Sequence, residues 1–323
     1  MECPNTSRLP AAGAAPERRV AGRENTARVQ PLAHSPASRQ SVGVNGNPVA
    51  DWDATARQVR EHFDRLGELE WDRLEQDLRS QVSLEIHRRF LRRMVSPGST
   101  VLEVGAGAGR FTVEIARLAA SVLVTDVSTA QLDANARRVE AAGLAEAVVG
   151  RTVADVRDLS SFDSAAFDAV VAYGGPLSYA FDGADRAVGE MLRVVKPGGR
   201  VVASVMSLLG SLRHFLPGVV ADIEAIGLDA FARLVETGDQ RHSPHQCHMF
   251  RWSELVALLE PFPCSIVDAS ASNCVSLGDA DALTALRRDE QLWRTFLDWE
   301  EAMCREPGAL DGGTHILFAA EKT

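Results

Sequence analysis

The sequence has few of the features that mark several common classes of protein. It contains no apolar run of about eighteen residues, the length that a helix needs to span a bilayer. Basic residues are in the minority, with 34 Lys and Arg against 44 Asp and Glu, and the net charge of -10 repels phosphate backbones. The five cysteines are irregularly spaced, unlike those of a disulfide scaffold. We therefore expect a cytoplasmic protein without a membrane or nucleic-acid partner.

The start of the chain is poor in large apolar residues. Residues 1–48 contain no Phe, Trp, Tyr or Ile and six of the 14 prolines. Such a segment cannot bury enough apolar surface to offset the entropy of ordering, so we expect a disordered extension. From Trp52 onward, apolar residues recur at helical spacing, and residues 49–98 are expected to form helices.

After residue 98 the pattern changes to short β-branched runs separated by helical stretches. The clearest runs are residues 101–104, 122–125, 169–172 and 200–205, and residues 265–269 and 314–320 are typical of two later strands. This alternation predicts a mostly parallel sheet that is covered on both faces, with the last two strands antiparallel. Helical stretches, including residues 212–236 and 252–259, fill two insertions at about 208–262 and 271–312.

A glycine-rich turn follows the first strand and precedes a helix. Gly105, Gly107 and Gly109 alternate with small residues there, and glycine lets the backbone take positive φ and approach a ligand. A dinucleotide fold would need glycine at position 110, where Arg110 stands. The spacing therefore disfavours NAD, although a tight turn without a ligand stays open as an alternative.

Acidic residues follow the next two strands. Asp126 lies seventeen residues after Gly109, where its carboxylate can accept hydrogen bonds from ribose hydroxyls. Asp155 and Val156 follow a third strand that is expected between the runs 122–125 and 169–172, where the carboxylate can accept from an adenine amino group and the amide can meet a ring nitrogen. Each signal is weak alone, but together they line the strand ends where ligands bind in open α/β sheets.

These motifs resemble those of the class I S-adenosylmethionine-dependent methyltransferases over roughly residues 95–207. Glu103 and the three glycines match the family's E/D-x-G-x-G-x-G motif. The resemblance implies a Rossmann-like, doubly wound sheet of seven strands with an antiparallel last strand, a methyltransferase domain over residues 99–323, a helical lid over 49–98 and a mainly helical substrate-binding cap. It also implies that the cofactor is S-adenosylmethionine and that its contacts are Glu103, Gly105, Ala106, Gly107, Gly109, Asp126, Val127, Asp155, Val156 and Tyr173.

Two tyrosines flank the loop after the fourth strand, which borders the transferable methyl group in the family that the chain resembles. Tyr173 begins a Tyr-Gly-Gly-Pro-Leu segment where nucleic-acid amino methyltransferases carry Asn/Asp-Pro-Pro-Tyr/Phe, which disfavours a nucleic-acid base as acceptor. Tyr173 is a candidate catalytic residue, and Tyr179 is a candidate substrate contact. Packing against the cofactor or a cap helix is the alternative for both.

A histidine cluster lies in the first insertion. Because imidazole can take a proton near neutral pH, His245 and His248 are candidate catalytic residues, and with His242 they are candidate substrate contacts. The H-x-x-H-x-C-H spacing fits no common zinc pattern, so no metal is expected. Ordinary loop packing remains the alternative.

These residues predict methyl transfer to an oxygen or nitrogen of a small molecule, by in-line displacement with release of S-adenosylhomocysteine. A protein or RNA methyltransferase and a non-catalytic cofactor-binding protein are the alternatives. Aromatic residues at helical spacing in residues 278–307 are consistent with core packing, a pocket wall or a homodimer face.

Overall fold

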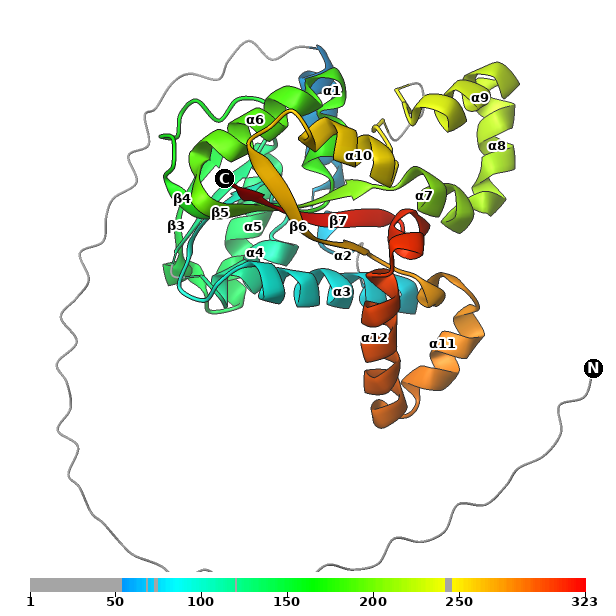
Figure 1. The fold of residues 1–323 in the computed structure, drawn as a ribbon. Helices are drawn as coiled ribbons and strands as arrows, with labels where there is room; N and C mark the ends of the chain where they lie inside the picture. Colours follow the sequence, from blue (N-terminus) through cyan, green and yellow to red (C-terminus); the bar gives the residue numbers. More distant parts are fainter. Residues whose placement is uncertain (1–53, 68, 73–74, 120, 242–245) are drawn as a thin grey trace, which may run out of the picture. The chain divides into compact units, whose positions relative to one another are not determined.

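A computed structural model of the protein describes residues 54–67, 69–72, 75–119, 121–241 and 246–323 (Figure 1). The extension expected over residues 1–48 lies outside the described residues, as do Trp52, His242 and His245. Seven strands form one sheet in the order β3-β2-β1-β4-β5-β7-β6. The strands are β1 (Thr100–Val104), β2 (Ser121–Asp126), β3 (Val148–Val153), β4 (Phe167–Ala172), β5 (Val195–Met206), β6 (Cys264–Ala271) and β7 (His315–Lys322).

One strand of the sheet is reversed. Strands β1 to β5 pair in parallel, whereas β7 runs antiparallel to both of its neighbours, β5 and β6. The last strand begins where the parallel strands end, because its first residue, His315, pairs with Met206 at the end of β5. The structure therefore confirms the expected doubly wound, Rossmann-like sheet with an antiparallel last strand.

Helices precede the sheet, connect its strands and fill the insertions. The α-helices are α1 (Ala54–Leu66), α2 (Leu69–Asp72), α3 (Leu78–Met94), α4 (Arg110–Ala116), α5 (Thr129–Ala141), α6 (Ala184–Val194), α7 (Leu208–His214), α8 (Leu216–Ile226), α9 (Leu228–Thr237), α10 (Trp252–Leu259), α11 (Ala280–Arg287) and α12 (Glu290–Cys304). Short 3-10 helices are η1 (Ala145–Ala147), η2 (Pro176–Tyr179), η3 (Phe181–Gly183), η4 (Val275–Leu277) and η5 (Pro307–Gly312). Among the described residues, none of these helices has both the length and the apolar character that crossing a membrane requires.

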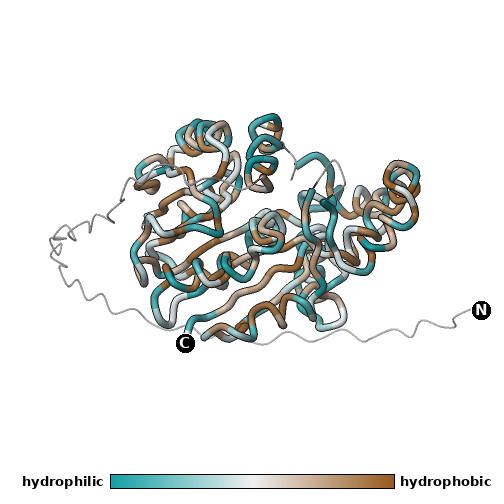
Figure 2. The backbone as a smooth tube through the Cα atoms, turned by 90° about the horizontal axis from the view of Figure 1, so that it is seen from above, coloured by the Kyte–Doolittle hydropathy of each residue, from teal (hydrophilic) through white to brown (hydrophobic). Residues whose placement is uncertain are grey.

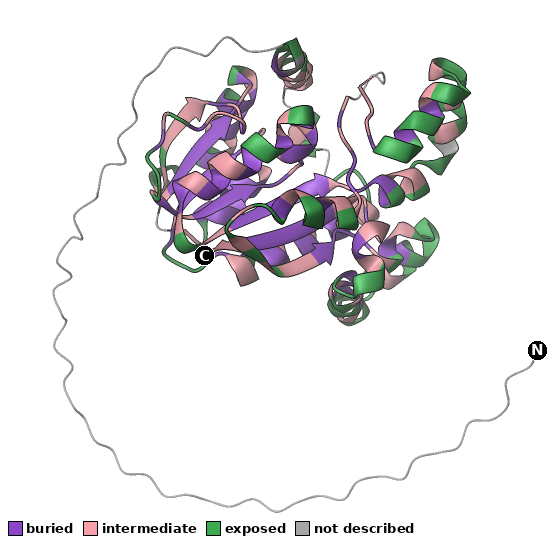
Figure 3. Ribbon diagram, turned by 45° about the horizontal axis from the view of Figure 1, so that its top comes forward, coloured by how far each residue is buried: buried purple, intermediate pink, exposed green. Residues whose placement is uncertain are grey.

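The core lies on the two faces of the sheet. On one face, alternate strand residues such as Leu102 and Val170 pack with α6 and α10. On the other, residues such as Val101 and Val171 pack with α3, α4 and α5. Figure 3 shows the strands as mainly buried, and Figure 2 shows them as mainly hydrophobic while the helices alternate in colour. Burial on both faces explains why the strand sequences are continuous apolar runs.

The N-terminal helices differ from the expected lid over residues 49–98. Helix α3 is a core helix, because Phe90 and Leu91 are completely buried against the sheet. It begins at Leu78, where the Asp77 side chain caps it by accepting a hydrogen bond from the Ser80 N–H at 2.8 Å. Of the expected lid, only α1 and α2 therefore remain outside the core.

Helical segments connect β5 with β6 and β6 with β7. The helix expected over 212–236 is divided at Phe215 and at Gly227, whose φ of 84° no helix accommodates. Helix α10 belongs to the sheet core rather than to a cap. In α12, Trp293 packs in a cluster that includes Ile86 of α3, whereas Trp299 is 63% exposed.

Candidate active site

The glycine turn lies at the end of β1. All three glycines have positive φ, with values of 67° for Gly105, 54° for Gly107 and 97° for Gly109. A Cβ on Gly105 would lie 2.5 Å from Cγ of Pro176, so any side chain there would clash. A Cβ on Gly107 would lie 3.8 Å from atoms of the Gln131 and Glu70 side chains, which is ordinary van der Waals contact. The turn therefore leaves its backbone accessible.

Gly109 has a different role from the one expected. It precedes the first residue of α4, and a Cβ there would lie 3.0 to 3.2 Å from atoms of Asn135 in α5. It is not among the residues that line the pocket beside the turn. We therefore correct its assignment from cofactor contact to the close packing of α4 on α5.

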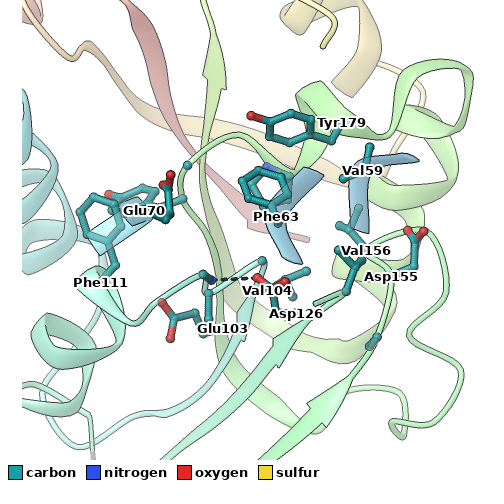
Figure 4. Close-up of a pocket in the computed structure, with 18 of the residues that line it drawn as sticks. Val59, Phe63, Glu70, Glu103, Val104, Phe111, Asp126, Asp155, Val156 and Tyr179 are labelled. Carbon is teal, nitrogen blue, oxygen red and sulfur yellow. Dashed lines mark hydrogen bonds between the residues drawn. The ribbon is translucent and has the colours of Figure 1, made fainter. Parts of the chain in front are cut away.

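Asp126 ends β2 and faces the turn. Its carboxylate accepts hydrogen bonds from the N–H of Gly107 at 2.8 Å, the dashed bond in Figure 4, and from the N–H of Ser128 at 2.9 Å. Burial raises the pKa of Asp126 to about 6, although these two hydrogen bonds act in the opposite direction. The carboxylate thus holds the turn and presents its remaining lone pairs to the pocket.

Glu103 lies on β1, beneath the turn. Its side chain is only 2% exposed, and its Oε2 atom is buried without a hydrogen-bond partner. Burial raises the pKa of Glu103 to about 8, and the nearby Asp126 contributes in the same direction. An unpaired buried carboxylate oxygen is costly, and a cationic donor in the pocket would satisfy it.

Asp155 and Val156 lie at the other end of the pocket from Glu103 (Figure 4). The Asp155 carboxylate accepts hydrogen bonds from the Arg157 side chain at 2.7 Å and from its backbone N–H at 2.8 Å. The cofactor contacts expected from the sequence, Gly109 excepted, line this one pocket, which we call the cofactor pocket. Its further lining residues, most of which the sequence motifs did not reveal, are Ala56, Val59, Phe63, Glu70, Val104, Ala108, Arg110, Phe111, Ala154, Arg157, Gly174, Pro176 and Tyr179.

Helices α1 and α2 cover the cofactor pocket. The Gln131 side chain donates to the carbonyls of Phe63 and Gly67, each at 3.0 Å, and the Phe63 ring meets Tyr179 edge-on at 5.2 Å. The Arg110 guanidinium lies 3.8 Å from the ring centre of Trp71. The space left beneath is about 100 Å³, less than the roughly 300–1,000 Å³ of typical ligand pockets.

Tyr173 lines the cofactor pocket but is not suited to accept a proton. Its side chain is 3% exposed, and its hydroxyl donates a long hydrogen bond of 3.5 Å to the His87 carbonyl in α3. Burial raises the pKa of the phenol well above its ordinary value, which keeps it protonated at neutral pH. The expected catalytic role is corrected to that of a pocket wall.

The structure does not bring His248 into the cofactor pocket. Its Nε2 atom lies 2.5 Å from Oε1 of Glu254, and its backbone N–H donates to the Ser178 carbonyl at 2.7 Å. Instead, two other histidines lie behind Tyr173. The ring centre of His87 is 5.1 Å from that of Tyr173, and the ring centre of His315 is 5.8 Å from that of His87. No sequence motif indicated that either histidine lies near the site. His315 reaches this edge of the sheet only because β7 runs antiparallel to β5.

Comparison with known proteins identifies the domain. Residues 101–199 match the family model described as a methyltransferase domain. The chain is 32% identical to a demethylmenaquinone methyltransferase of Clavibacter sepedonicus, over 47% of this chain and 60% of the relative. It is 34% identical to the ubiquinone/menaquinone biosynthesis C-methyltransferase UbiE of Acidiphilium cryptum, over 37% of this chain and 49% of the relative. It thus spans about half to three fifths of these curated relatives.

A solved structure shares the fold. The crystal structure of the [4+2]-cyclase SpnF matches with a TM-score of 0.55 at 19% identity, over 83% of this chain and 96% of that one. That fold is thus found in a protein named for a different reaction, so the fold alone does not determine the chemistry. The residues that match the methyltransferase domain include the glycine turn, Asp126 and Asp155, all of which belong to the first half of the parallel sheet and its strand ends.

Proposed function

We propose that the protein transfers the methyl group of S-adenosylmethionine to an oxygen or nitrogen of a small molecule and releases S-adenosylhomocysteine. The observation that carries the proposal is the unpartnered Oε2 of Glu103, buried beside an open glycine turn. A carboxylate in that position can pair with the ammonium group of the cofactor's methionine part.

The other residues of the pocket fit the same cofactor. Asp126 is placed to accept hydrogen bonds from ribose hydroxyls, and Asp155 and Val156 border the space for an adenine ring. With Glu70 and Glu103, these acids outnumber the two cations of the lining, Arg110 and Arg157, and the excess suits a positively charged sulfonium. The open backbone at Gly107 leaves room for the ligand to lie against the turn.

The bound cofactor supplies a methyl group on a positively charged sulfur, which an acceptor attacks in line. The chain's own contribution is to align the acceptor and exclude water. Phe63 of α1, in edge contact with Tyr179, closes the pocket over the turn. Residues of α1 and α2 therefore act as the lid, and Tyr179 is proposed to border the acceptor.

An oxygen or nitrogen acceptor loses a proton during transfer, and a nearby imidazole can take it. The rings of His87 and His315 behind Tyr173 favour this acceptor class. The His87 Nδ1–H donates to the Ser83 carbonyl at 2.8 Å, so this ring is held in one orientation. Transfer to carbon is the second candidate, because one matched relative is named a C-methyltransferase.

The proposal is tested by calorimetric titration of the purified chain with S-adenosylmethionine, S-adenosylhomocysteine and NADH. Binding of the first two without NADH is expected, followed by transfer of labelled methyl in an acceptor screen. NMR of the product identifies the methylated atom. Failure to bind either sulfur cofactor would overturn the proposal, and cofactor binding without transfer to any acceptor would favour a non-catalytic role.

A further inference from the structure

A second and larger cavity lies beside the cofactor pocket. It holds about 670 Å³, within the range of roughly 300–1,000 Å³ typical of small-molecule sites. Its walls come from the start of α3, from α7 to α9 and the segment before α10, from η4 and from the first residues of β7. We call it the second cavity.

Two side-chain contacts join the second cavity to the cofactor pocket. Tyr179 lines the cofactor pocket and packs against a cluster that includes Leu234 and Met249, which line the second cavity. The second contact runs through His87, whose ring meets Tyr173 of the cofactor pocket and also meets His315 of the second cavity. The two hollows therefore border each other at Tyr179, whereas three aromatic rings lie between them on the Tyr173 side.

The lining of the second cavity is mainly apolar with a few polar groups. The apolar residues are Met206, Leu212, Phe215, Val219, Phe231, Leu234, Met249 and Leu277. Three charged residues also line the cavity. Asp77 and Arg79 are opposite in sign, and the Asp77 carboxylate caps α3. Asp222 is exposed to solvent. Such a surface selects a molecule by size and apolar area rather than by net charge.

Two histidines supply polar contacts in the second cavity. His214 has a buried Nδ1 without a hydrogen-bond partner. Burial lowers the pKa of His214, and the nearby Arg79 acts in the same direction, so the ring is neutral at neutral pH. The Nδ1 of His315 lies 3.2 Å from the Thr314 hydroxyl at the end of the cavity nearest His87. An acceptor's polar group would meet a hydrogen-bonding group at either position.

We propose that the second cavity is the acceptor site, and that it takes a bulky, mainly apolar molecule with a hydroxyl or amine directed towards His315. This inference rests on the proposed methyl transfer and names the class of its substrate. During transfer the sulfur–methyl bond breaks, the methyl–oxygen or methyl–nitrogen bond forms, and the acceptor's proton passes to the imidazole of His315.

The test uses the uncharged fluorescent probe N-phenyl-1-naphthylamine, titrated into the full chain with and without saturating S-adenosylhomocysteine. Leu277→Arg in η4 and Val219→Arg in α8 each introduce a charge into the lining of the cavity. Val275→Arg and Val220→Arg are the matched controls, because these neighbours are 52% and 62% exposed and do not line it. Affinity for S-adenosylhomocysteine is measured by calorimetry on every variant.

We expect one probe molecule to bind per chain while S-adenosylhomocysteine is bound. The affinity for the probe should fall at least about tenfold in the two lining variants and stay unchanged in the two controls. Displacement of the probe by S-adenosylhomocysteine, or equal probe affinity in all variants, would overturn the inference and leave the proposed function standing. Failure of the wild-type chain to bind S-adenosylhomocysteine would instead overturn the proposed function, and this assignment with it.

Discussion

The cofactor pocket and the second cavity are built in different ways. Between Glu103 and Tyr179, the cofactor pocket takes its residues from consecutive strand ends within one continuous stretch of chain. The second cavity brings together segments that are far apart in the sequence, as when the Asn273 side chain donates to the Arg79 carbonyl at 3.1 Å. A short local motif can therefore reveal the first site, whereas the second is created by the docking of distant elements.

The two sites also differ in the hydrogen bonds that hold their walls in place. The glycine turn is held by the Asp126 carboxylate of the neighbouring strand. The wall of the second cavity at η4 depends on Glu300 of α12, which is completely buried and accepts hydrogen bonds from the N–H groups of Cys274 at 2.7 Å and Val275 at 3.0 Å. The cofactor pocket thus depends on the sheet, and the second cavity depends on an inserted helix.

The largest expected effect is the loss of cofactor affinity when Gly107 is replaced, and its control measures the effect of backbone strain alone. Gly107→Val should lower cofactor affinity by at least about 100-fold, because the side chain would fill the space beside the turn. Gly198→Val is the matched control, since Gly198 also has positive φ, at 71°, and nothing lies within 4 Å of the position that a Cβ would take there. Both variants carry left-handed strain of about 1–2 kcal/mol. Calorimetry should show lost binding in the first and unchanged binding in the second, and equal affinities would contradict the assignment of the turn.

A smaller effect concerns the proton on Glu103. At pH 7 this carboxyl is mostly protonated, because its pKa is about 8, and pairing with an ammonium group favours the ionised form. Cofactor binding should therefore release close to one proton. Calorimetry in buffers of different ionisation enthalpy measures this release. Glu103→Gln should abolish it and weaken binding about tenfold, since a hydrogen bond between charged groups contributes about 1.5–3 kcal/mol.

The same group makes stability depend on pH. Folding raises the pKa of Glu103 from its ordinary 4.5 to about 8, so the folded chain keeps a proton that the unfolded chain loses. The contribution of Glu103 to the free energy of unfolding is therefore present below pH 4.5 and is lost as the pH rises through 8. Chemical denaturation across this range should show a steeper decline for the wild type than for Glu103→Gln, and identical slopes would show that Glu103 ionises freely.

The smallest effect concerns His248, which the sequence favoured as a catalytic residue. Its ring is engaged with Glu254, so His248→Ala should change the turnover number less than about twofold and lower the free energy of unfolding by about 0.5–1 kcal/mol. Steady-state kinetics and chemical denaturation measure the two quantities. A loss of turnover of about 100-fold with unchanged cofactor affinity would restore the catalytic assignment.

Local sequence patterns predicted the elements that depend on short-range order. Residues 252–259 form α10 over the range that the apolar periodicity indicated. The pattern over 212–236 could not show that Phe215 and Gly227 divide the chain into three helices, because periodicity alone does not reveal a break in direction. It also could not distinguish α3, which packs in the core, from the covering helix α1, since both are amphipathic.

The sequence by itself determined the doubly wound sheet and the strand-end residues of the cofactor pocket, because strand ends, glycine spacing and acidic residues are local features that parallel pairing brings to one edge. Only the tertiary structure decided which histidines lie near the site. Reversal of β7 carries His315 to that edge, whereas the pairing of His248 with Glu254 keeps its ring engaged elsewhere. Side chains separated by more than a hundred residues meet only when the whole chain packs, and no local pattern encodes that meeting.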